Sequence, residues 1–142
     1  MQWGIDHEDE ARNAYMARTG FLVDLSGFMY RNFLRVGCSP DGLIDQDGML
    51  EIKCPTSTTH VEYLEAKNLP SKYRAQVQGQ LWVSGRQWCD FVSFDPRMPG
   101  NLQLLIVRVQ RDEDYIKTLK TEVTKFMEEV ETMEARLRME AA

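Results

Sequence analysis

The sequence predicts a single α/β domain in which helices flank a mixed central β-sheet. Three observations lead to this fold class. The expected elements alternate in the order helix, strands, helix, strands, helix; the segment at 50–54 alternates apolar and polar residues; and the C-terminal region repeats apolar residues with helical spacing. A chain of 142 residues has room for one core. We expect one domain over residues 1–142, with a body at 1–111 and an amphipathic helix at 112–142.

The first half of the chain contains a helix and two strand pairs. A helix is expected from Asp6 to Arg18, with Gly20 ending it. Residues 21–36 favour two short strands around a turn at Ser26-Gly27. The turn formers of Asp45-Gln46-Asp47-Gly48 fold the segment at 39–55 into a hairpin.

The second half continues with helices and strands. A Thr/Ser cluster at 56–59 leads into a helix that ends before Pro70, and Ser71 is expected to cap another helix that runs to about Ser84. Beta-branched and aromatic residues predict strands at 87–94 and 102–109.

The hairpin at 39–55 carries the strongest functional signal. A strand has a side-chain period of two, so Glu51 and Lys53 share one face while Ile52 and Cys54 take the other. Mirroring the arms about the turn brings Asp41 close to Glu51 and Lys53. Carboxylates are hard oxygen ligands suited to Mg²⁺, and a lysine can orient or deprotonate a water. This combination is typical of phosphodiester cleavage, although a Glu-x-Lys pair by itself is usually a solvated ion pair.

Four motifs in order along the chain resemble the PD-(D/E)xK nucleases, and within them the lambda exonuclease or YqaJ-like viral recombinase family. The motifs are Cys38-Ser-Pro-Asp-Gly-Leu43, Leu50-Glu-Ile-Lys-Cys-Pro55, Ala75-Gln-Val-Gln78 followed by Trp82, and Phe94-Asp-Pro-Arg-Met98. Trp3-Gly4 with Glu8 and Ala11-Arg12 is similar to the helix that precedes the core in that family. The resemblance spans roughly residues 3–115 and implies a restriction-endonuclease-like core.

The resemblance also implies roles for individual residues. Asp41 and Glu51, with the backbone carbonyl of Ile52, would bind one or two Mg²⁺ ions, and Mn²⁺ is expected to substitute. Lys53 would act on the nucleophilic water, and partial burial would lower its pKa. Glu8 and Gln76 would complete the set of catalytic residues. On residue chemistry alone, Glu8 could equally be an exposed carboxylate near a helix N-terminus, and Gln76 could be an ordinary side chain on a helix surface.

Several hydroxyl and basic side chains are candidates for DNA contact. The hydroxyls next to the expected catalytic strand could bind phosphate or simply cap a helix, and two basic residues flank the start of the helix that carries Gln76. These candidates are Ser39, Thr56, Ser57, Thr58, Lys72 and Arg74.

Composition places limits on the class of protein. No apolar run is long enough to span a membrane and no leader opens the chain, so we expect a protein of the cytoplasm, that of a bacterial host if the chain comes from a phage. Three cysteines and two histidines lack metal-ligand spacing. Net charge is −5, of which the segment at 112–142 carries −4, so the body is close to neutral and a local basic path for DNA is possible.

The C-terminal helix is expected from Asp112 to about Met139, roughly 40 Å at 1.5 Å per residue. Its apolar stripe could pack along its own domain, or its far half could dock on another subunit or a partner protein. The stripe consists of Ile116, Leu119, Val123, Phe126, Val130, Met133 and Leu137.

The function that these observations favour is Mg²⁺-dependent hydrolysis of DNA. The resemblance implies a 5′→3′ exonuclease on double-stranded DNA that leaves 3′ single strands for a single-strand annealing recombinase, working as a trimeric homo-oligomer. Family members usually carry a further segment before the Trp-Gly motif, so this chain is expected to be a short form or incomplete. A nicking or structure-specific endonuclease and a non-catalytic DNA- or partner-binding module are the alternatives.

Overall fold

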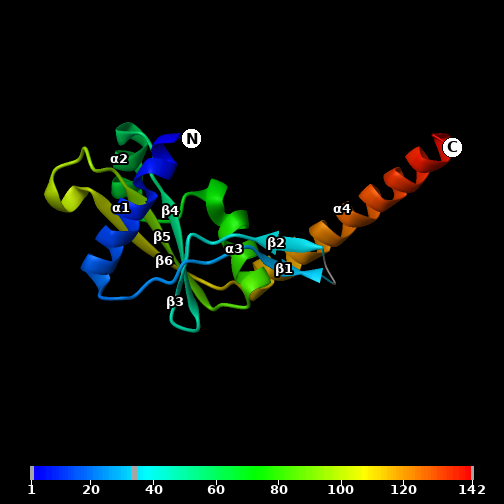
Figure 1. The fold of residues 1–142 in the computed structure, drawn as a ribbon, viewed down its shortest axis with the longest axis horizontal. Helices are drawn as coiled ribbons and strands as arrows, with labels where there is room; N and C mark the ends of the chain where they lie inside the picture. The colour runs from blue at the N-terminus through cyan, green and yellow to red at the C-terminus, as the bar shows by residue number, and fades with distance from the viewer. Residues whose placement is uncertain (1, 33–34, 142) are drawn as a thin grey trace.

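A four-stranded mixed sheet lies at the centre of the molecule (Figure 1). The structure is a computed structural model that describes residues 2–32 and 35–141. The strands β3 (Gly42–Ile44), β4 (Gly48–Lys53), β5 (Trp88–Phe94) and β6 (Leu104–Gln110) are neighbours in that order. The pairs β3–β4 and β5–β6 are antiparallel, whereas β4 and β5 are parallel. The predicted mixed sheet is therefore confirmed.

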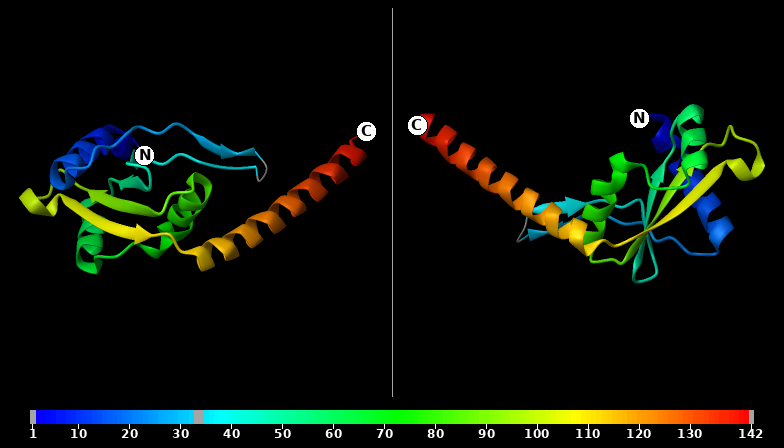
Figure 2. Two further views of the ribbon diagram at one scale, coloured as in Figure 1. Left: turned by 90° about the horizontal axis from the view of Figure 1, so that it is seen from below. Right: turned by 180° about the vertical axis from the view of Figure 1, so that it is seen from behind.

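Helices cover both faces of this sheet (Figure 2). Helix α1 (Gln2–Thr19) lies on one face, and α2 (Ser57–Ala66) and α3 (Arg74–Ser84) lie on the other. Two 3₁₀ turns, η2 (Ser71–Tyr73) and η3 (Gly100–Leu102), complete the connections. Because β4 and β5 are parallel, the chain must cross between their ends, and α2 and α3 form that crossover.

The period of two along β4 places its side chains as the sequence predicts. Leu50 and Ile52 pack into the same cluster as Ala11 and Tyr15 of α1. Met49, on the opposite face, packs against α3 in a second cluster with Val77 and Leu81. Strand β4 is buried except at its last residue, so the face that carries Glu51 lies beneath α3.

A two-stranded antiparallel ribbon of β1 (Met29–Arg31) and β2 (Val36–Cys38) extends from the body. The predicted turn at Ser26-Gly27 is wrong, because the two strands of the ribbon are connected by residues 32–35 instead. Residues 33 and 34 of this connection lie outside the described residues. Tertiary packing explains the difference. Met29, Val36 and Cys38 pack against Trp82, Val83 and Ile116, a partnership that local turn propensity does not reveal.

The last helix, α4 (Glu113–Glu140), leaves the body and projects into solvent (Figure 1). It begins as predicted, with the Asp112 side chain accepting a hydrogen bond from the Tyr115 N–H. Ile116 is buried, and Leu119 and Val123 pack against the cluster that contains Trp82. The four remaining residues of the predicted apolar stripe are exposed, namely Phe126, Val130, Met133 and Leu137. The prediction that α4 packs along its own domain therefore applies only to its first three turns.

Two other expectations concern helix ends. Gly20 ends α1 in a left-handed conformation with φ of 76°, as predicted, although the helix starts at Gln2 rather than Asp6. Ser71 does not cap α3; it opens a 3₁₀ turn, and Tyr73, which precedes α3, makes no side-chain capping bond. Among the residues that the structure describes, no helix is both long and apolar enough to cross a bilayer.

Candidate active site

A cleft of about 540 Å³ opens where β4 ends, between the start of α1 and the start of α3. The five residues that the sequence analysis proposed as catalytic all line it: Glu8, Asp41, Glu51, Lys53 and Gln76. They come from α1, the turn before β3, β4 and α3. The structure therefore brings together residues up to 68 positions apart, from Glu8 to Gln76, in one concave site.

Asp41 occupies a gap left in the sheet. Strand β3 pairs only with residues 48–50, so the outer edge of β4 is open beyond Leu50. There the Ile52 N–H donates to Asp41 Oδ2 at 2.7 Å, in place of a strand partner. Because the N–H and C=O of one strand residue point the same way, the Ile52 carbonyl faces the same open edge. Mirroring the hairpin predicted this proximity correctly.

Glu51 is buried and saturated with donors. Lys53 Nζ and Gln76 Nε2 both donate to Oε1, at 2.5 and 2.6 Å, and Gln80 Nε2 donates to Oε2 at 2.9 Å. Gln80 received no functional role from the sequence, although its position one turn after Gln76 was the available signal. Its Oε1 is buried and has no hydrogen-bond partner among the described residues.

The burial of carboxylates shifts pKa values in the cleft. Burial, and then the neighbouring charge of Glu51, raise the pKa of Asp41 to about 7. Burial alone would lower the pKa of Lys53, but its hydrogen bond to Glu51 and the charges of Glu51 and Asp41 raise it instead. The expected fall in the pKa of Lys53 is therefore wrong in this geometry, because the carboxylates outweigh burial.

Glu8 reaches the cleft from α1 but is already engaged. Arg12 donates to Glu8 Oε1 at 2.6 Å and to the Asp41 carbonyl at 3.3 Å. Arg12 is itself buried, and it ties the helix to the turn that holds Asp41. The spacing of four residues between Glu8 and Arg12 predicts an ion pair, but the contact of Arg12 with Asp41 depends on tertiary structure.

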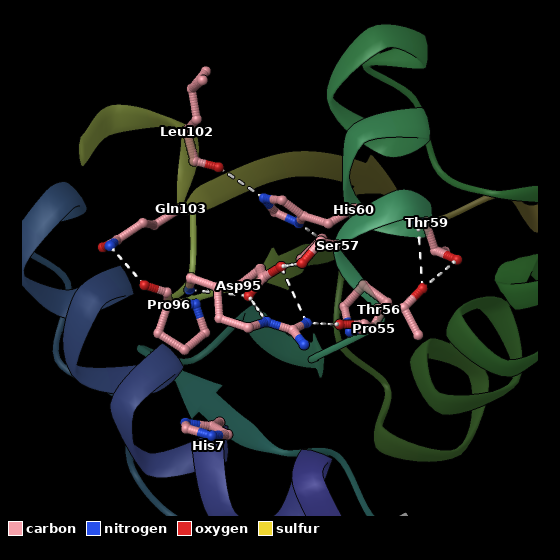
Figure 3. A network of polar contacts seen from close by, with 12 residues as sticks. His7, Pro55, Thr56, Ser57, Thr59, His60, Asp95, Pro96, Leu102 and Gln103 are labelled. Carbon is pink, nitrogen blue, oxygen red and sulfur yellow. Dashed lines mark hydrogen bonds and ion pairs between the residues drawn. The ribbon is translucent and has the colours of Figure 1, made fainter. Parts of the chain in front are cut away.

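The hydroxyl candidates for DNA contact have different surroundings. Ser39 and Thr58 are exposed. Thr56 lines the cleft and also caps α2 by accepting from the Thr59 N–H. Ser57 donates to Asp95 Oδ2 at 2.5 Å, so it supports a buried carboxylate (Figure 3).

The two basic candidates flank the start of α3. Lys72 is exposed and lies over the rings of Tyr63 and Tyr73. Arg74 pairs with Asp112 at 3.0 Å and stacks on Tyr115. Neither lines the cleft as the structure describes it, so their role as DNA contacts stays a prediction.

The donor chemistry of the site fits a hard divalent cation. The carboxylates of Asp41 and Glu51 line one cleft, and the carbonyl of Ile52 faces the open strand edge beside Asp41. Within residues 2–32 and 35–141, no three His, Cys, Asp or Glu side chains converge as metal ligands. Any ion here would thus be held by the two acids with backbone or water oxygens, while Glu8 stays paired with Arg12.

Comparison with solved structures finds the same fold in nucleases. An alkaline exonuclease, LHK-Exo from Laribacter hongkongensis, superimposes with a TM-score of 0.96 at 39% identity over 99% of this chain and 73% of that one, and its complex with dAMP gives the same values. A phage-related exonuclease from Haemophilus somnus 129PT gives a TM-score of 0.64 at 17% identity, covering 93% and 72% of the two chains, which shows a common fold.

Sequence comparison agrees with the structural one. The uncharacterized protein ExoD of Escherichia coli (strain K12) is 33% identical over 63 residues, which are 44% of this chain and 71% of that protein. Residues 1–87 match the family described as the YqaJ-like viral recombinase domain. That match includes Asp41, Glu51, Lys53 and Gln76 of the cleft, and the chain is a member of the YqaJ-like viral recombinase domain family.

Proposed function

We propose that this chain is a Mg²⁺-dependent DNA exonuclease. The observation that carries the proposal is the convergence of Asp41, Glu51 and Lys53 in one cleft, where Lys53 donates to Glu51 and Asp41 accepts from Ile52 of the same strand. Similarity to an alkaline exonuclease over 99% of the chain supports it, because that likeness includes the whole cleft.

Each residue of the cleft has a distinct task in this proposal. Asp41, Glu51 and the Ile52 carbonyl would hold the cation, with Mn²⁺ able to substitute for Mg²⁺. When bound, a divalent cation polarises the scissile phosphate and lowers the pKa of a coordinated water. Lys53, which its raised pKa keeps as an ammonium, would orient the attacking water, while Gln76 and Gln80 fix the Glu51 carboxylate by direct hydrogen bonds.

The finer features of the reaction are part of the same proposal. We infer 5′→3′ digestion of double-stranded DNA from an end, which leaves 3′ single strands for a single-strand annealing recombinase. The exposed apolar residues of α4 favour assembly into a homo-oligomer, a trimer by the resemblance described above. We place the activity in the cytoplasm, that of a bacterial host if the chain comes from a phage.

Digestion of linear and circular plasmid in Mg²⁺ tests the function. Loss of linear DNA with intact circles supports an exonuclease, nicking of circles indicates an endonuclease, and binding without cleavage indicates a non-catalytic module. Substrates with a 5′ phosphate or a 5′ hydroxyl, labelled at either end, determine the polarity. Omission of the divalent cation, with EDTA added, is the matched control and should abolish cleavage.

A further inference from the structure

An arginine outside the proposed catalytic set also lines the cleft. Arg97 lies in the loop after β5 and belongs to the cleft wall together with Lys53 and Thr56. Among the described residues, Arg97 and Lys53 are the cationic side chains that line this cleft, against three carboxylates. Lys53 is committed to Glu51. Arg97 is itself paired with Asp95, but its side chain is 47% exposed against 25% for Lys53, so it is the more accessible positive charge for a polyanion that enters the cleft.

The orientation of Arg97 is fixed by a buried carboxylate. Asp95 is completely buried at the end of β5 and accepts from Arg97 Nε at 2.7 Å and from Nη2 at 3.2 Å. Ser57 and the Arg97 backbone N–H donate to the same carboxylate (Figure 3). Burial alone would raise the pKa of Asp95, but the hydrogen bonds from Arg97 and Ser57 lower it to about 2. The pair therefore stays ionised at neutral pH.

Two further contacts hold the plane of the guanidinium. Arg97 Nη2 donates to the Pro55 carbonyl at 3.3 Å, and the guanidinium carbon lies 4.4 Å from the centroid of the Trp3 ring. Nη1 makes no hydrogen bond to the part of the chain that the structure describes, and the side chain is 47% exposed. A guanidinium held in this way offers its free Nη1 as a preorganised, charged donor to a phosphate oxygen at little entropic cost.

A second cluster in the molecule has nearly the same construction away from the cleft. Arg108 donates to buried Asp90 through Nε and Nη2, both at 2.8 Å, and Tyr15 O–H donates to the same carboxylate. The Arg108 guanidinium lies 3.7 Å from the centroid of Trp88, and its side chain is 41% exposed. The described cleft lining contains Arg97 and leaves out Arg108. Arg108 is therefore a matched control that lies outside the cleft lining.

We propose that Arg97 is a DNA-positioning residue that binds a backbone phosphate of the strand lying in the cleft, with Asp95 and Trp3 presetting its orientation. The inference rests on the proposed function, since it assigns a contact to the substrate of that reaction. It makes Arg97 a contact for any sequence, because phosphate carries no base information.

The experiment measures the salt dependence of DNA binding by Arg97→Gln and Arg108→Gln. Both variants and the wild type bind a blunt, 5′-phosphorylated duplex of about a dozen base pairs in EDTA, which prevents cleavage. Each phosphate neutralised by the protein contributes a slope of about −0.9 in log K against log salt for duplex DNA, or about −0.7 for a single strand. Arg97→Gln should lose about one such unit, whereas Arg108→Gln should keep the wild-type slope.

Arg97→Lys separates the charge from the shape of the guanidinium. Lysine keeps the positive charge but loses the planar fork and the stacking on Trp3, so it should retain most of the slope and bind more tightly than Arg97→Gln. Thermal unfolding of all three variants identifies any loss of fold, and Arg97→Lys remains the test if Arg97→Gln unfolds.

Distinct outcomes overturn the two proposals. A wild-type slope in Arg97→Gln, with a drop in unfolding temperature like that of Arg108→Gln, means that Arg97 only ties the loop to α1. In that case linear DNA is still digested by the wild type, and the proposed function stands. Absence of both DNA binding and digestion in the wild type removes the function and this contact together.

Discussion

Proteins usually bury apolar side chains and expose charged ones. The cleft and the distal half of α4, residues 126–140, depart from this rule in opposite ways. In the cleft, the carboxylate of Glu51 is buried and needs three donors to stay there. On distal α4, apolar residues such as Phe126 and Leu137 face solvent. Buried charge costs free energy unless it is paired, and exposed apolar stripes mark surfaces that bind. The cleft therefore indicates chemistry, and distal α4 indicates association.

The comparison predicts that the two regions can be inactivated independently, and the largest effect should come from the acids. Asp41→Asn and Glu51→Gln each keep the shape of the side chain but remove a charged ligand oxygen. Cleavage should fall by more than about 100-fold, beyond what residues that merely support metal ligands cause. Nuclease assays check the loss. Thermal unfolding should show an equal or higher melting temperature for Asp41→Asn, because carboxylate repulsion is relieved, and a lower one for Glu51→Gln, because its amide N–H group would face a donor. Full activity in either variant would contradict the assignment.

Lys53→Ala should affect chemistry more than metal binding. Its ammonium has no lone pair for a metal, so its contribution is to the water or the phosphate, and general acid–base groups typically supply about 10²–10⁴-fold in rate. Calorimetric titration with Mg²⁺ should give an affinity near that of the wild type while cleavage collapses. A loss of Mg²⁺ affinity as great as in Asp41→Asn would show that the two roles were divided wrongly.

Changing distal α4 should alter assembly and leave cleavage chemistry largely present. Burying each of Val130, Met133 and Leu137 at an interface would contribute roughly 1.5–3 kcal/mol. Deleting residues 129–142, or replacing these three by Ser, should therefore lower the sedimenting mass. Replacing Glu128 and Ala135 by Ser is the matched control, because at about 100° per residue they lie opposite the stripe. Unchanged mass with a much lower melting temperature would mean that the helix only completes its own core.

The smallest effect should be a pH dependence of stability at Asp95. Its pKa is about 2 in the fold against a usual 3.9 in an unfolded chain, so its ionised form stabilises the fold by roughly 2 kcal/mol at neutral pH. That contribution is complete above about pH 5 and is lost as the pH falls towards 2. Urea unfolding should thus show Asp95→Asn less stable than the wild type at pH 7, with the difference shrinking at acidic pH. A constant difference from pH 7 to pH 3 would contradict the assignment.

Local periodicity was sufficient to predict the framework of the cleft. The turn at residues 45–48 set the hairpin register, which placed Asp41 beside Glu51, and helical spacing put Gln76 and Gln80 on one face of α3. These relations depend on neighbours a few residues apart, so strand and helix geometry determine them. The extent of α4 could also be predicted, because its N-terminal cap and its apolar repeat depend on residues close in sequence.

Contacts between segments far apart in the chain could not be predicted from the sequence. Nothing local links Arg97 to Trp3, or Arg12 to the carbonyl of Asp41, because each contact forms only after α1 docks on the sheet. The ribbon turn was misplaced for the same reason, since Trp82 and Ile116 select its register. Roles as metal ligands, DNA contacts and subunit surfaces stay predictions that the experiments above address.

The shortness of β3 has a consequence for solubility. Where β3 stops, the outer edge of β4 would present unpaired backbone groups to any extended chain, and such an edge invites strand addition and aggregation. Asp41 occupies that edge by accepting from Ile52, which satisfies a backbone donor that an approaching strand would otherwise bind. The carboxylate proposed to bind the cation thus also protects the sheet against self-assembly. A chain lacking this acid should be more prone to precipitate from concentrated solution than one in which Asn keeps the accepting oxygen.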